Sequence, residues 1–168
     1  MKRLVLALAM MALIVAGASA IDFGANFSMF PEEDAQLYGL TIRSVGEGFI
    51  GFDLTAMTPA LSTAGNPLEN FIDLINNRDQ IDEAWFLPTL LVNASMKPVH
   101  FYAGAGPFIY LEKLDGRWSP SLPDYIFGKV GAQVNVAFLG AYAEAGALYN
   151  WNFGTFEPLY TFGAVLNF

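Results

Sequence analysis

Apolar and polar residues alternate at every second position through most of the chain that follows residue 20. In the first such segment Phe23 and Phe27 fall on one face, and Asp22 and Asn26 fall on the other. A period of two is typical of a β-strand, because successive side chains point to opposite sides of the strand. The pattern therefore predicts strands with one apolar face and one polar face.

Eight segments carry this alternation, at residues 22–29, 38–43, 49–56, 85–95, 99–111, 125–136, 139–151 and 156–168. A tilted strand needs about 9–11 residues to cross a membrane, and most of the segments reach that length. The joins after the second, fourth and sixth segments are short, whereas the others are longer or more polar, the largest spanning 58–84. Strict alternation of short and long joins is typical of periplasmic turns and external loops.

Charged residues gather on the polar face of these segments, and the opposite face is almost uncharged. The polar face includes Arg43, Asp53, Lys129 and Glu144. An open sheet in lipid would leave edge N–H and C=O groups unpaired at several kcal/mol each, so the sheet must close. We therefore expect an all-β fold, an eight-stranded antiparallel up-and-down transmembrane β-barrel with the charges inside.

The four charged residues are the candidate site in the lumen. Counting back from the turn at 137–138 makes Lys129 and Glu144 near-diagonal partners, whereas Arg43 and Asp53 are expected to match less well in height. A salt-bridge network that fills the lumen is the first interpretation. A gate or narrow ion path lined by the same groups is the alternative.

The first twenty residues have the features of a cleaved secretory signal peptide. Lys2 and Arg3 precede an apolar run at 4–16, and small residues at 18–20 form a cleavage site. The expected mature domain is 21–168, which retains six of the eight basic residues against sixteen acidic ones. Such an acidic chain is a poor ligand for nucleic acid. The chain has no cysteine, so its stability must come from burial and backbone pairing.

Three further features predict local structure. Pro88 and Pro107 fall inside strands, where each removes a ladder donor, so bulges are expected there. Glycines on the inward face make room for large rings such as Tyr102 and Tyr142, so the lumen should be plugged. Asn66 begins a helical pattern within the long loop, and this short helix could cover the barrel mouth, rest on lipid or bind a partner.

Catalysis is not expected from this composition. His100 is the only histidine, and without a second histidine or a cysteine neither a triad nor a typical zinc site can be assembled around it. A structural or solvated role for His100 is the simpler interpretation. No catalytic residue, cofactor or metal site is therefore predicted.

The last strand carries a motif that resembles the C-terminal β-signal of bacterial outer-membrane proteins. The motif consists of Thr161, Gly163, Leu166 and the terminal Phe168. The segment 101–107, with alternating Gly and Ala, likewise resembles a strand of small OmpA/OmpX/OmpW-type barrels. The resemblance implies an outer-membrane location, contact with outer-membrane lipid and recognition of the last strand by the barrel-assembly machinery.

Two functions remain open from the sequence. The first is a non-enzymatic, surface-exposed structural barrel whose external loops interact with a host or surface ligand. The second is a narrow channel or an OmpW-like transporter of small hydrophobic molecules. Apolar residues on the inward side favour the second, namely Leu87, Leu91, Phe108 and Leu148.

Overall fold

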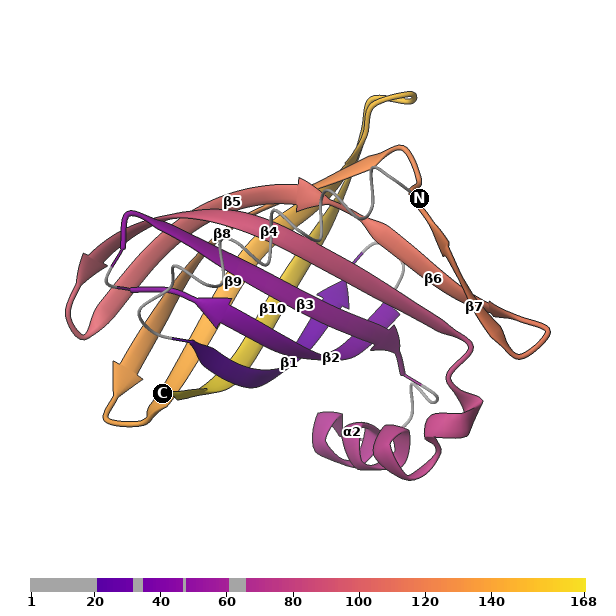
Figure 1. The fold of residues 1–168 in the computed structure, drawn as a ribbon, viewed down its shortest axis with the longest axis horizontal. Coiled ribbons are helices and arrows are strands. Elements are labelled where there is room, and N and C mark those ends of the chain that lie inside the picture. Colours follow the sequence, from indigo (N-terminus) through magenta and orange to yellow (C-terminus); the bar gives the residue numbers. More distant parts are fainter. Residues whose placement is uncertain (1–20, 32–34, 47, 61–65) are drawn as a thin grey trace.

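A computed structural model describes residues 21–31, 35–46, 48–60 and 66–168 of the chain. The expected signal peptide lies outside the described residues. The described part is a curved, strongly twisted sheet with one helix beside it (Figure 1). Its elements are β1 (Asp22–Phe30), β2 (Ala35–Ser44), β3 (Ile50–Pro59), α2 (Pro67–Asn76), η1 (Arg78–Gln80), β4 (Glu83–Met96), β5 (Val99–Pro107), β6 (Ile109–Leu114), β7 (Arg117–Ser121), β8 (Tyr125–Val136), β9 (Leu139–Asn150) and β10 (Thr155–Asn167).

Eight of the strands form a closed antiparallel barrel. The hydrogen-bonded order is β3-β2-β1-β10-β9-β8-β5-β4, and β4 pairs with β3 to complete the circle. The first and last strands are neighbours, with Asp22 opposite Asn167. The predicted eight-stranded barrel is therefore confirmed.

The alternation in the sequence becomes the two faces of the barrel wall. On β2, for example, Leu40 is 63% exposed on the outside, whereas Thr41 and Arg43 are buried on the inside. On β8, Val130 is exposed while its neighbour Lys129 is buried. Apolar side chains thus cover the outside of the barrel and charged side chains are enclosed.

The barrel has short turns at one end and longer connections at the other. The start of β1 and the end of β10 lie at the same end of the barrel as the connections from β2 to β3, from β4 to β5 and from β8 to β9. The opposite end carries the β3–β4 connection with α2, and the β6–β7 hairpin, which projects beyond the barrel (Figure 1). Asp115 and Gly116 form the tip of that hairpin with φ of 51° and 75°, as a two-residue turn with a left-handed backbone requires.

The fifth predicted segment is divided at Phe108 into β5 and β6. β5 pairs with β8 as far as Pro107 opposite Ile126, whereas β6 pairs with β7 in a register that is offset by two residues. The two extra residues belong to the segment between the end of β7 at Ser121 and the start of β8 at Tyr125.

The bulge expected at Pro88 is absent, whereas the pairing is irregular beside Pro107, where the β5–β8 register ends and β6 continues with β7 two residues out of step. β4 keeps one register with β3 through the pair Leu54–Pro88, and it keeps one register with β5 and then with β6. That register sets the two prolines opposite each other. Both residues lack the N–H that a ladder would use, so the β4–β5 pairing is interrupted there without an inserted residue.

The predicted helix forms, and Asn66 and Glu69 cap it reciprocally. The Glu69 N–H donates to Asn66 Oδ1 at 3.0 Å, and the Asn66 N–H lies 3.4 Å from Glu69 Oε2. The helix does not cover the barrel mouth, because it packs against the outer face of the wall at Tyr38. No helix within the described residues is long and apolar enough to span a membrane.

Candidate functional site in the barrel lumen

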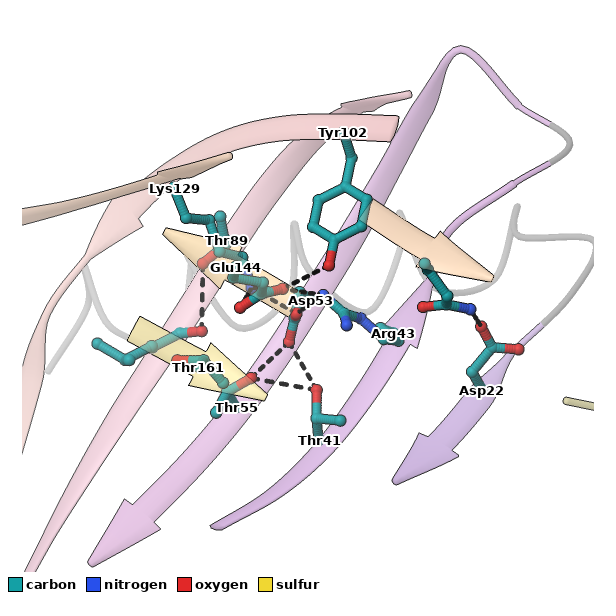
Figure 2. A network of polar contacts seen from close by, with 12 residues as sticks. Asp22, Thr41, Arg43, Asp53, Thr55, Thr89, Tyr102, Lys129, Glu144 and Thr161 are labelled. Carbon is teal, nitrogen blue, oxygen red and sulfur yellow. Dashed lines mark hydrogen bonds and ion pairs between the residues drawn. The ribbon is translucent and has the colours of Figure 1, made fainter. Parts of the chain in front are cut away.

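Two basic and two acidic side chains meet in the middle of the lumen (Figure 2). Arg43 Nη2 lies 2.5 Å from Asp53 Oδ2 and also contacts Glu144 Oε1. Lys129 Nζ lies 2.6 Å from Asp53 Oδ2 and 3.0 Å from Glu144 Oε1. Each base therefore contacts both acids, and we call these four residues the ionic layer.

The strand registers explain why the four side chains converge. Glu144 lies opposite Gly131, which places it diagonally from Lys129 across the β8–β9 ladder, as the sequence predicts. Arg43 lies directly opposite Asp53 on β2 and β3, so the expected difference in height is wrong. The sequence alone does not reveal this register, because the 45–49 turn between the strands is longer than a two-residue hairpin loop.

Hydroxyl groups and aromatic rings surround the ionic layer. Thr41 and Thr55 donate to Asp53 Oδ1 at 2.8 Å and 2.6 Å, and Tyr102 Oη donates to Glu144 Oε1 at 2.8 Å. The guanidinium carbon of Arg43 lies 4.0 Å from the ring centroid of Tyr142 and 4.9 Å from that of Tyr102. A cation close to the face of an aromatic ring is attracted by the ring quadrupole.

Charge balance makes this buried arrangement possible. The four formal charges sum to zero, and each side chain is at most 5% exposed. Arg43 Nε and Nη1 have no hydrogen-bond acceptor among the residues that the structure describes, and the tyrosine rings are the favourable neighbours of the guanidinium there. Buried charges are tolerated when they are paired and hydrogen-bonded, and removal of one partner leaves an uncompensated charge.

A ring of apolar side chains, which the sequence pattern does not reveal as a unit, lies next to the ionic layer. Each of the eight barrel strands, counting β5 and β6 as one, contributes one buried residue to it. The members are Phe30, Leu37, Met57, Leu87, Phe108, Phe127, Leu148 and Leu159, each at most 6% exposed. We call this set the apolar ring. Trp85, Tyr110 and Tyr125 pack against it.

The end of the barrel with the short turns holds a polar layer. Gln133 Nε2 donates to Asp22 Oδ2 at 2.7 Å and to Asn135 Oδ1 at 2.9 Å. His100 is buried there, with Nδ1 2.9 Å from Ser95 Oγ, and Ser95 donates in turn to the carbonyl of Gly46. His100 thus lies in a structural hydrogen-bond chain rather than near the ionic layer.

The four residues of the C-terminal motif divide between the two faces of β10. Thr161 points inward and its Oγ1 lies 2.7 Å from Ser28 Oγ, and Gly163 lies beneath the Tyr142 ring. Leu166 and Phe168 point outward, and the Phe168 ring packs edge-on against Phe23 at 5.9 Å. The motif therefore combines inward packing with an apolar outer edge.

Comparison with known proteins identifies the fold. No protein-family model and no curated protein matches the sequence. The structure is similar to the N-terminal β-barrel domain of Pseudomonas aeruginosa OprF, with a TM-score of 0.62 and 12% identity over 90% of this chain and 98% of that one. Ail, the attachment invasion locus protein of Yersinia pestis, matches with a TM-score of 0.46 and 11% identity over 89% of this chain and 95% of that one. The chain has the closed eight-stranded barrel fold of the OprF domain.

Proposed function

We propose that the chain is an exported, integral outer-membrane barrel with a sealed lumen, which acts without catalysis by presenting its external loops. The apolar ring is the observation that carries this proposal. The ring places one buried apolar side chain from each of the eight barrel strands across the lumen, next to a charge-neutral ionic layer.

The outside of the barrel supports residence in a membrane. Large apolar side chains remain exposed on strands all around the wall, among them Leu40, Leu90, Val130 and Phe162. A soluble protein rarely leaves so continuous an apolar surface in water. Closure of the sheet pairs the strand edges, which hydrocarbon demands of any spanning backbone.

The side chains that fill the lumen support the proposal that the barrel is sealed. An ion that crossed it would have to leave water for the apolar ring, and desolvation of a bare charge is expensive. The ionic layer offers no net charge to compensate that cost, because its bases and acids neutralise one another. Leu87, Phe108 and Leu148, which favoured transport in the sequence, are members of the ring.

The external end offers surfaces for a host or surface ligand. The β6–β7 hairpin projects beyond the barrel, and the β9–β10 turn presents Phe153, which is 80% exposed. Loops on a rigid scaffold are common sites of recognition. Presentation of such loops needs no reacting centre.

A second candidate is an OmpW-like transporter of small hydrophobic molecules. A cavity of about 540 Å³ opens in the wall beside Pro107 and is lined by Phe108, Tyr125, Ile126 and Trp151, among others. Phe108 and Tyr125 also contact or belong to the apolar ring, so the cavity adjoins the lumen. A displaced Phe108 side chain would connect the two.

Flux through reconstituted protein separates the candidates. Vesicles that contain the wild-type barrel should retain a trapped ionic dye and exclude an external alkyl-chain probe as well as protein-free vesicles do. Probe uptake that Phe108→Trp abolishes would support transport and contradict the sealed barrel. Ion leakage that changes with Lys129→Met would instead support a gate in the ionic layer.

A further inference from the structure

We infer that the groove between α2 and the outer wall of β2 and β3 binds an acyl chain of a membrane lipid, with α2 lying at the membrane surface. This inference rests on the proposed membrane location of the barrel. It assigns a lipid-binding site to the long loop, which otherwise only connects β3 to β4.

The helix has three differently occupied sides. Asn70 and Leu74 are buried against the wall, and Glu69 and Asp73 are exposed on a second side. On the third side, Ile72 and Ile75 are 48% and 56% exposed. The wall therefore covers only part of the apolar surface of α2. A helix at a membrane surface has this arrangement, with lipid facing its remaining apolar side.

One polar contact fixes the helix on the wall. Asn70 Nδ2 donates to Tyr38 Oη at 3.3 Å, and Tyr38 Oη donates to Gln36 Oε1 at 3.1 Å. The Phe71 ring packs against the Tyr38 ring with centroids 6.3 Å apart. Tyr38 is 2% exposed although it faces outward, because the helix covers it.

The groove beside this contact has a volume of about 300 Å³ and an almost entirely apolar lining. Leu40 and Ala56 supply its wall side, Phe71 and Ile75 its helix side, and Trp118 reaches it from β7. Leu40 is also part of the exposed apolar outer face of the barrel, followed on the same face by Ile42. The groove is thus continuous with the surface that the proposal places in lipid.

The polar groups of the lining are satisfied within the protein. Thr58 Oγ1 donates to the carbonyl of Glu83 at 2.8 Å, and Tyr38 Oη bonds with Asn70 and Gln36. A peptide in the groove would lose hydrogen bonds to water and gain none from these side chains. An alkyl chain loses none, so the lining favours an acyl chain over a protein segment.

Trp118 provides a probe within the groove. The full protein with Trp85→Phe and Trp151→Phe retains Trp118 as its only tryptophan. We would reconstitute it into phosphatidylcholine vesicles containing lipids brominated on the upper acyl chain, and measure quenching of Trp118 fluorescence. The matched variants fill one small outward position each, Ala56→Phe in the groove and Ala143→Phe on β9. Flotation with vesicles and faster migration on an unboiled gel report insertion of every variant.

An acyl chain in the groove predicts strong quenching that Ala56→Phe reduces at least twofold and Ala143→Phe leaves unchanged. Equal quenching in the two variants, or weak quenching in an inserted barrel, would overturn this inference alone. Quenching that depends on the protein-to-lipid ratio would also overturn it, in favour of a second copy in the groove. Failure of the parent protein to float with vesicles would overturn the proposed function as well.

Discussion

Tyr142 lies directly across the β9–β10 ladder from Gly163, and its ring covers the glycine so closely that a Cβ there would overlap the ring atoms. Tyr142 in turn provides the ring face beneath the Arg43 guanidinium. The glycine of the C-terminal motif therefore has a packing role in the lumen, whatever its role in assembly.

Gly163→Ala should destabilise the barrel by about 1–3 kcal/mol, because it overpacks a filled lumen. We expect this loss of stability in protein that has been refolded into detergent micelles, where no assembly machinery is present. Denaturant unfolding in the micelles would measure it. On a Tyr142→Ala background the same substitution should cost little. A cost that stays the same on both backgrounds would contradict the packing role.

Lys129→Met should be strongly destabilising, by about 3–5 kcal/mol, because it leaves a buried negative charge in the ionic layer. The double variant Lys129→Met with Glu144→Gln restores neutrality around Arg43 and Asp53, and should be more stable than the single variant. Urea unfolding in micelles would measure both. Lys113→Met is the matched control, because Lys113 lies 3.8 Å from exposed Asp82 and such pairs contribute less than about 1 kcal/mol. A double variant less stable than Lys129→Met would contradict the charge-balance account.

Much of the fold follows from the sequence, because alternation fixes which face each residue takes. The eight strands, the enclosed charges and the short helix are all confirmed. The direct pairing of Arg43 with Asp53 could not be predicted, since alternation assigns each residue to a face but does not fix the register between two strands. The side of the barrel on which α2 packs depends on tertiary contacts that its amphipathic pattern does not specify.

The apolar ring shows a second limit of sequence reasoning. Its members can each be assigned to the inward face by alternation, and several were. Their common level across eight strands emerges only when the stagger between neighbouring strands is known. Without that stagger, Leu87 and Phe108 looked like the lining of a path rather than parts of a seal.

The apolar ring makes a prediction about conductance. The double variant Phe108→Ser with Phe127→Ser removes two aromatic side chains from the apolar ring. It should produce stepwise ion conductance in a planar lipid bilayer. The wild type should show none. Phe156→Ser, which changes an exposed ring on the outer face of β10, should also remain silent. Steady conductance by the wild type equal to that of the double variant would show that the ring does not seal the lumen.

The orientation of the wall, with apolar side chains outside and charges inside, is the claim on which the other proposals depend. Fractionation of cells that express the full chain, with unboiled and boiled samples compared on a detergent gel, tests it directly. We predict that the protein is found in the outer membrane and migrates faster when it is not boiled. A detergent-free, soluble monomer in the periplasm or the medium would contradict the claim.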